Sequence, residues 1–96
     1  MSENTARLHA VVQGHVQGVG FRYFVSEKAK NLSIKGWVRN TFKGEVEVMA
    51  EGNRKQLEEL LGALHQGPSI SMVVHVSVEW LEPEGKFTQF SLAHTA

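Results

Sequence analysis

The order in which strand-like and helix-like patterns follow one another is the feature that most constrains the fold of this sequence. Apolar and polar residues alternate over residues 6–13 and 45–52, which is typical of strands with one buried face. Residues 21–32, and the leucine-rich segment between Asn53 and Gly67, carry apolar residues at helical spacing. Further strand patterns cover residues 34–40, 73–81 and 86–93. The predicted order is therefore β-α-β-β-α-β, followed by one more strand.

This order predicts the architecture, because each half is a strand, a helix and a strand. Right-handed crossovers place both helices on one face of an antiparallel sheet. We therefore expect an α/β (α+β) fold, a two-layer ferredoxin-like sandwich with a short C-terminal strand. The 96 residues suit one domain, covering 1–96. The glutamates of residues 45–52 are expected to form a solvated sheet face.

The composition excludes several classes of function. Ten basic residues balance ten glutamates, so no global charge attracts nucleic acid or an anionic membrane. The sequence has no Asp or Cys, and its five histidines lack metal-ligand spacing, so we expect no metal and no cofactor. The polar N-terminal segment does not resemble a signal peptide, and no apolar run is long enough for a membrane span. We expect a cytoplasmic protein.

Three glycines lie close together between the first strand and the first helix, in the segment "GHVQGVGFR" of residues 14–22. Glycines allow loop amides to turn inward, and the first N–H groups of a helix lack intrahelical acceptors. Arg22 lies in the first helical turn, where its guanidinium can bind an oxyanion bidentately. The segment therefore predicts a cradle for a tetrahedral anion, although its spacing matches neither the P-loop nor the dinucleotide fingerprint. The alternative is a structural glycine-rich turn beside a surface arginine.

The segment "GHVQGVGFR", followed by "GWVRN" at residues 36–40, resembles the acylphosphatase family. The similarity continues through "GEVEVMAEG", the leucine-rich helix and "VEW" near residue 80, so it covers most of the chain. It implies a single acylphosphatase-like domain that hydrolyses the carboxyl–phosphate bond of small acyl phosphates without a metal. It also implies that inorganic phosphate is both the product and a competitive inhibitor. The chain is expected to be a monomer.

The resemblance implies roles for individual residues. Arg22 matches the family's phosphate-binding arginine, and Asn40 matches the asparagine that orients the attacking water, so these two are the expected catalytic residues. The expected substrate-binding residues, which act mainly through loop amides, are His15, Val16, Gln17, Gly18, Val19 and Gly20. The side chain of His15 is expected to be solvated. The sequence departs from the family's pattern at Lys43, at Val74 and in its missing C-terminal aromatic residue.

Two other functions compete with this interpretation. A non-enzymatic module that binds phosphate or carbamoyl phosphate needs Arg22 and the loop but not Asn40. An RNA-binding module of the same fold needs exposed aromatic residues on the first and third strands. Those positions carry glutamates at 45 and 47, which repel a phosphate backbone, so the sequence disfavours RNA.

Overall fold

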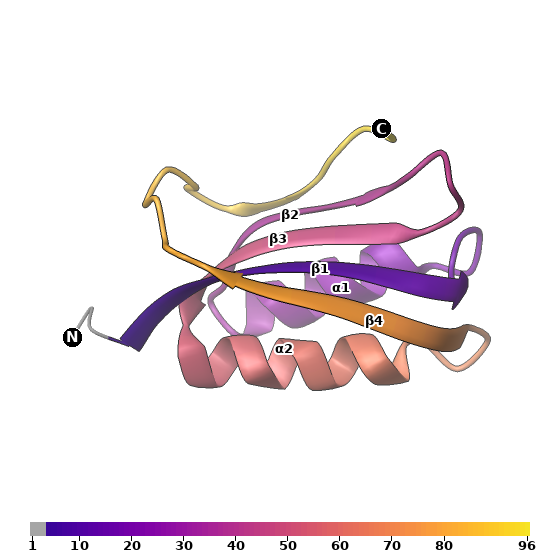
Figure 1. Ribbon diagram of the computed structural model, residues 1–96, viewed down its shortest axis with the longest axis horizontal. Coiled ribbons are helices and arrows are strands. Elements are labelled where there is room, and N and C mark those ends of the chain that lie inside the picture. Colours follow the sequence, from indigo (N-terminus) through magenta and orange to yellow (C-terminus); the bar gives the residue numbers. More distant parts are fainter. Residues whose placement is uncertain (1–3) are drawn as a thin grey trace.

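Five strands and two helices make up the computed structural model, which describes residues 4–96 (Figure 1). The strands form one sheet in the order β4-β1-β3-β2-β5. The elements are β1 (Thr5–His15), α1 (Phe21–Asn31), β2 (Lys35–Asn40), β3 (Val46–Asn53), α2 (Arg54–Gln66), β4 (Met72–Leu81) and β5 (Phe90–Leu92).

The structure confirms the predicted two-layer ferredoxin-like sandwich. Both helices cover the same face of the sheet (Figure 1). The four long strands pair antiparallel, whereas β5 pairs parallel with β2, so the complete sheet is mixed. The sequence predicted the C-terminal strand but did not show which neighbour it would join. β5 covers only Phe90–Leu92, which is shorter than the expected strand.

The core lies between the sheet and the helices, where the alternation of the sequence placed it. Leu8, Ala10 and Val12 of β1 are fully buried, as predicted from their shared face. On α2, Leu61 is only partly buried, although it shares the helical spacing of its neighbours. Each large apolar side chain that folding removes from water contributes about 1.5–3 kcal/mol. Other fully buried members of the core are Val25, Ala29, Val38, Val46, Val48, Ala50, Leu57, Leu60 and Leu64.

The start of α2 has the predicted side-chain cap. Asn53 has an extended backbone, and its Oδ1 accepts a hydrogen bond from the N–H of Lys55 at 2.9 Å. Gly67 ends the helix, and its N–H donates to the carbonyl of Ala63 at 2.8 Å. The local sequence therefore specifies both ends of this helix.

The open face of the sheet differs from the prediction at Glu51. We expected the glutamates of β3 to be solvated, but Glu51 is only 7% exposed. Its carboxylate accepts hydrogen bonds from Arg7 at 2.6 Å and from the N–H groups of Glu84 and Gly85 at 2.7 and 3.0 Å. The segment that joins β4 to β5 thus lies over this end of β3 and buries a charge that the alternation alone assigned to solvent.

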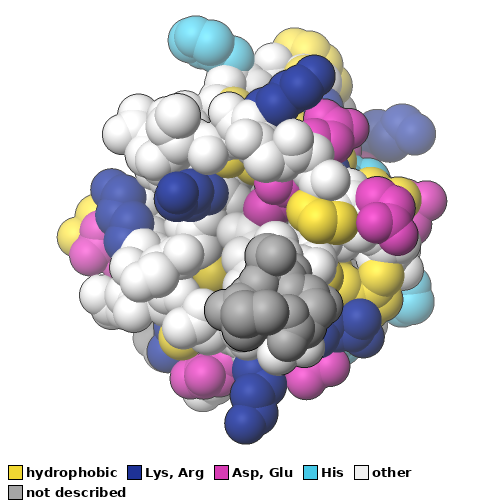
Figure 2. Space-filling view, turned by 90° about the vertical axis from the view of Figure 1, so that its left-hand side faces the viewer, with side chains coloured by type: hydrophobic (Ala, Val, Ile, Leu, Met, Phe, Trp, Pro, Cys, Tyr) yellow, Lys and Arg dark blue, Asp and Glu magenta, His cyan; other side chains and the backbone are white. Residues whose placement is uncertain are grey.

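The surface at the end of the molecule seen in Figure 2 carries both signs of charge. Basic and acidic side chains are interspersed there, and hydrophobic side chains lie singly or in small groups between them. This mixture agrees with the formal net charge of zero. None of the helices within residues 4–96 is long and apolar enough to cross a membrane.

Candidate active site

The predicted site residues gather at one end of the sheet because of the strand directions. β3 runs antiparallel to both β1 and β2, so β1 and β2 point the same way. Their carboxyl ends, at His15 and Asn40, therefore lie at the same end of the molecule. The chain leaves β1 there, passes through residues 16–20 and begins α1, as the right-hand end of Figure 1 shows.

Two valines anchor the loop that joins β1 to α1. Val16 is 1% exposed and belongs to the core, and Val19 is partly buried against the same core. Their side chains bind the loop to the layer between the sheet and the helices. Because these two side chains face inward, the backbone between them is held at the surface.

The glycines of the loop have two different structural roles. Gly18 and Gly20 have φ of 75° and 78°, and a Cβ on either would meet no heavy atom within 4 Å. Glycine suits both positions because other residues rarely adopt this positive-φ backbone conformation. Gly14 also has a positive φ, but there a Cβ would collide with the carbonyl oxygen of Met72. Gly14 therefore permits close strand pairing between β1 and β4, beside the irregularity at residues 13 and 14.

A continuous run of backbone N–H groups follows β1. Within the part of the chain that the structure describes, no N–H group of residues 16–23 donates a hydrogen bond to a protein acceptor. The first of these belong to the loop and the last to the first turn of α1, where such donors have no intrahelical partner. Gly20 caps α1 without a side-chain hydrogen bond. The N-terminal end of α1 is therefore free to bind an anion through backbone amides.

Arg22 extends this donor set with a positive charge. It is the second residue of α1 and is half-buried. No carboxylate lies within 4 Å of its guanidinium among residues 4–96. The first turn of α1 also contains no acidic residue. The positive end of the helix dipole and the arginine thus both favour a negatively charged ligand at this end of α1.

Asn40 ends β2 on the helix side of the sheet. Its partner in the strand pair is Val46, which is fully buried against the helices, and paired residues of neighbouring strands project from the same face. Arg39 projects from the other face, where its Nε donates to Glu47 at 2.8 Å. Asn40 and Arg39 therefore project from opposite faces of the sheet.

Gln17 connects the loop to the β2–β3 hairpin. Its Nε2 donates to the carbonyl oxygens of Thr41 and Glu45, both at 2.8 Å. Thr41 directly follows Asn40, so this side chain fixes the loop next to the predicted water-orienting residue. We expected Gln17 to contribute as part of the amide cradle, and the sequence did not reveal that its side chain joins the two halves of the site.

The turn of the β2–β3 hairpin is held by the side chain of Thr41. The sequence did not reveal this role. The Thr41 hydroxyl accepts hydrogen bonds from the N–H groups of Lys43 and Glu45 at 3.3 and 3.1 Å. The only signal in the sequence was the general tendency of threonine to bind nearby backbone in turns. Lys43, at which the sequence departs from the family's pattern, is exposed in this turn.

His15 lies next to the loop, as the last residue of β1. The side chain of His15 is exposed at the end of β1, as expected. Within residues 4–96, no group of three or more His, Cys, Asp or Glu side chains is placed to hold a metal ion. The donors that the site presents are those of an anion-binding site.

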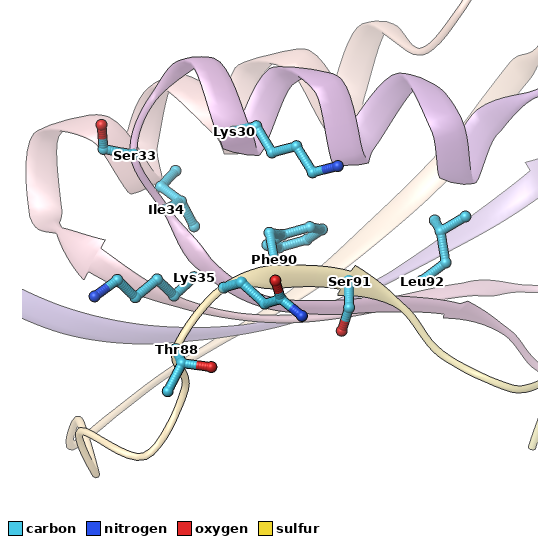
Figure 3. A pocket seen from close by; sticks show the side chains of 9 residues that line it. Lys30, Ser33, Ile34, Lys35, Thr88, Phe90, Ser91 and Leu92 are labelled. Atoms are coloured by element: carbon cyan, nitrogen blue, oxygen red, sulfur yellow. The ribbon is translucent and has the colours of Figure 1, made fainter.

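A separate cavity of about 580 Å³ lies between α1 and β5 (Figure 3). Figure 3 shows Lys30 extending from α1 above Phe90. None of the predicted site residues lines it, since its walls come from Lys30, from residues 33–35 and from residues 88–92. This cavity lies at the C-terminal end of α1, whereas the predicted site lies at the N-terminal end.

Known proteins are similar to this chain in both sequence and structure. The sequence model of the acylphosphatase family matches residues 8–92. An acylphosphatase of Thermococcus kodakarensis is 48% identical over 79 residues, which cover 82% of this chain and 87% of that protein. The crystal structure of acylphosphatase from Bacillus subtilis has a TM-score of 0.89 at 36% identity and covers 92% of this chain and 98% of that chain. For the acylphosphatase from Coxiella burnetii the TM-score is 0.90 at 36% identity, with 96% of each chain covered. The chain therefore belongs to the acylphosphatase family.

Proposed function

We propose that this member of the acylphosphatase family hydrolyses small acyl phosphates to a carboxylate and inorganic phosphate, through Arg22, Asn40 and the amides of the β1–α1 loop. The observation that carries the proposal is that, among residues 4–96, Arg22 has no carboxylate partner and the neighbouring N–H groups have no acceptor. These are the donors that a dianionic phosphoryl group requires. The substrate-binding set comprises the loop residues from His15 to Gly20.

Few catalytic groups are needed, because the leaving group is a good one. A carboxylate is the conjugate base of an acid with a pKa of about 4–5, so it departs without a general acid. Phosphoryl transfer through a loose transition state depends mainly on positioning and on stabilisation of charge. In our proposal the loop amides and Arg22 stabilise the negative charge of the phosphoryl oxygens.

Asn40 positions the nucleophile in this proposal. Its side-chain amide offers a donor and an acceptor to a water molecule, and its place on the helix side of the sheet supports the role. Gln17 supports it further, because its two hydrogen bonds fix the residue after Asn40 next to the loop. The proton of the attacking water passes to a phosphoryl oxygen, since the proposal includes no strong protein base.

The proposal extends to ligands and surroundings. Inorganic phosphate competes with substrate, because the site recognises the tetrahedral group. The reaction needs no metal ion and no cofactor, which agrees with a donor set of amides and a guanidinium. We propose no nucleic acid or membrane partner, in keeping with the balanced charge, and a cytoplasmic location, in keeping with the absence of cysteine.

Hydrolysis of benzoyl phosphate, with and without EDTA, tests the reaction directly. We expect equal rates in both conditions, and inhibition by phosphate that is competitive with substrate. Loss of activity on chelation, with recovery on adding magnesium or zinc, would contradict the metal-free mechanism. Non-competitive inhibition would place phosphate at a different site.

The variant Asn40→Ala separates an enzyme from a module that only binds phosphate or carbamoyl phosphate. In the enzyme, kcat should fall by about two orders of magnitude or more, while the affinity for phosphate should change little. Arg22→Ala should instead abolish phosphate binding. Circular dichroism and thermal unfolding of both variants come first, because Asn40 ends a strand. A folded Asn40→Ala variant with the parent rate would favour the binding module.

A further inference from the structure

A second cavity, of about 390 Å³, opens along one side of α1. Its walls include Gly20, the last residue of the predicted amide cradle, so the cavity begins where the candidate phosphate site ends. From there it follows Phe24, Lys28 and Asn31, whose spacing of four and three places them on one face of the helix. Pro68, from the turn after α2, completes the wall. The cavity is therefore a groove that is continuous with the candidate active site.

The packing around the groove holds it open. A Cβ on Gly67 would lie 2.8 Å from Cε2 of Phe21, so the turn after α2 approaches the start of α1 as closely as a glycine allows. The turn is fixed by Ser71, whose Oγ and N–H both donate to the carbonyl of Pro68, at 2.7 and 2.9 Å. Phe21 is fully buried, and its ring meets the ring of Phe24 edge-on with centroids 6.0 Å apart. The half-buried ring of Phe24 is thus a rigid apolar wall.

The groove and Asn40 lie on opposite sides of the β1–α1 loop. Pro68 precedes β4, which begins at Met72 opposite His15, whereas Asn40 ends β2. β1, from which the loop departs, lies between β4 and β2 in the sheet, and the turn before β4 lies at the same end of the molecule as the loop (Figure 1). The attacking and leaving oxygens of phosphoryl transfer are roughly in line. A water beside Asn40 therefore directs the leaving acyl group toward the groove.

Apolar side chains are exposed around the groove. Tyr23, which lines it, directly follows Arg22 in the first turn of α1 and is 66% exposed. Ile70 and Met72, from the turn after α2 and the start of β4, are exposed to a similar extent. Exposed apolar side chains that gather beside a site favour an apolar ligand there. Tyr23 and Phe24 together offer two aromatic rings to such a ligand.

The charges in the groove favour a neutral acyl group. Among the residues that the structure describes, Glu27 and Lys28 are the charged side chains that line it, and their charges are opposite. The groove therefore carries no net charge. A second carboxylate on the acyl group would meet as much repulsion as attraction, whereas a neutral ring makes apolar contacts without that cost.

We propose that this groove binds the acyl part of the substrate, and that Tyr23 determines a preference for acyl phosphates with a flat, neutral, aromatic acyl group. The inference rests on the proposed function, because it concerns the same site and names its substrate class. Phosphate is bound by the loop and Arg22, and the acyl ring packs against Tyr23 and Phe24. Offset or edge-on packing of aromatic rings gives this contact its selectivity.

Two substrates with the same phosphoryl group test the subsite. Tyr23→Ser removes the ring, so the ratio of kcat/KM for benzoyl phosphate to kcat/KM for acetyl phosphate should fall at least about fivefold, mainly through KM. Tyr23→Phe keeps the ring and should leave the ratio within about twofold of the parent. Phe42→Ser is the matched control, because Phe42 is an aromatic residue of the β2–β3 hairpin that is 84% exposed and does not line the groove. It should leave the ratio unchanged.

Binding without reaction provides a second measurement. Phenacylphosphonate and acetonylphosphonate correspond to benzoyl phosphate and acetyl phosphate with a methylene in place of the bridging oxygen, so neither can be hydrolysed at that bond. In calorimetry the parent should bind phenacylphosphonate at least about fivefold more tightly than acetonylphosphonate. Tyr23→Ser should abolish that difference and leave the affinity for acetonylphosphonate within about twofold.

The outcomes distinguish the subsite from the proposed function. A parent chain that hydrolyses neither substrate would refute the proposed function, and the subsite with it. If both substrates are hydrolysed but Tyr23→Ser leaves the ratio unchanged, or lowers both values of kcat/KM equally, the subsite alone is refuted. An effect of Phe42→Ser as large as that of Tyr23→Ser would also refute it, because the preference would then come from the apolar surface in general.

Discussion

Two arginines of this molecule, Arg22 and Arg39, have opposite surroundings. Arg39 lies on the open face of the sheet, where its Nε donates to Glu47 at 2.8 Å and its guanidinium lies 4.5 Å from the centre of the Trp37 ring. Arg22 lies at the start of α1, where no described acidic residue comes within 4 Å of its guanidinium. The charge of Arg39 is therefore neutralised within the protein, whereas in our proposal a phosphoryl group neutralises the charge of Arg22.

The largest expected effect is a loss of activity on substitution of Arg22, which tests the difference between the two arginines. Arg22→Lys keeps the charge but loses the planar pair of donors that binds phosphate oxygens. We expect kcat/KM for benzoyl phosphate to fall at least about a hundredfold, which corresponds to about 3 kcal/mol. Arg39→Lys is the matched control and should change kcat/KM less than about threefold. If Arg22→Lys retained nearly full activity, the arginine would serve only as a nearby charge.

The next effect concerns stability and tests the buried carboxylate of the open face. Glu51→Gln removes the charge that Arg7 and two backbone N–H groups bind, so we expect the free energy of unfolding to fall by about 2 kcal/mol. Glu58→Gln is the control, because the Glu58 carboxylate pairs with Arg54 in an exposed position at 3.2 Å, and it should cost less than about 0.5 kcal/mol. Urea unfolding measures both. Equal losses would show that burial adds nothing to this ion pair.

The case of Glu51 shows where prediction from sequence ended. Alternation of polar and apolar residues predicted the strands, the buried face of β1 and the cap at Asn53, because these depend on local pattern. Burial of Glu51 depends on a segment more than thirty residues away, which lies over β3 only after folding. The parallel pairing of β5 with β2 has the same cause, since no local pattern encodes which edge a terminal strand joins.

The candidate site also contains some features that the sequence predicted and others that it did not. Arg22 and the glycine-rich loop were predicted from the chemistry of one short segment, whereas Asn40 was predicted only from the resemblance of two motifs to the acylphosphatase family. The side chain of Gln17 was not, since a glutamine has many possible partners and its two acceptors are carbonyls of a distant hairpin. The sequence predicted the groups that we propose to act on substrate, but it did not predict the contact of Gln17 that joins the loop to the hairpin.

An intermediate loss of activity is expected when the contact between Gln17 and the hairpin is removed. Gln17→Ala removes both hydrogen bonds to the hairpin and allows the loop to shift relative to Asn40, so kcat/KM should fall about tenfold. Gln13→Ala is the control, because within residues 4–96 the side chain of Gln13 makes one hydrogen bond, an exposed one to the carboxylate of Glu45 at 3.0 Å. Both variants are assayed with benzoyl phosphate after a check of thermal unfolding. A Gln17→Ala variant as active as Gln13→Ala would show that the loop holds its position by its valines alone.

The smallest expected effect is the pH dependence that Glu47 contributes to stability. Burial raises the pKa of Glu47, but hydrogen bonds and charge from His9 and Arg39 outweigh burial and hold that pKa below its ordinary value of 4.5. A carboxylate whose pKa is lowered by folding stabilises the native state above the unfolded value. That contribution disappears as the pH falls through the folded pKa. The carboxylate should therefore stabilise the protein at neutral pH and cease to do so in acid.

The variant Glu47→Gln makes this dependence measurable. Relative to the parent, its free energy of unfolding should be lower by a few tenths to about 1 kcal/mol near pH 7, because the ion pairs are only partly buried. The difference should shrink as the pH falls below about 4.5, whereas Glu59→Gln, at an exposed position on α2, should show no such trend. A difference that stayed constant into acid would mean that the shape of the side chain, and not its charge, matters. Because Glu47 lies on the face away from Arg22, kcat at neutral pH should stay at the parent value in either case.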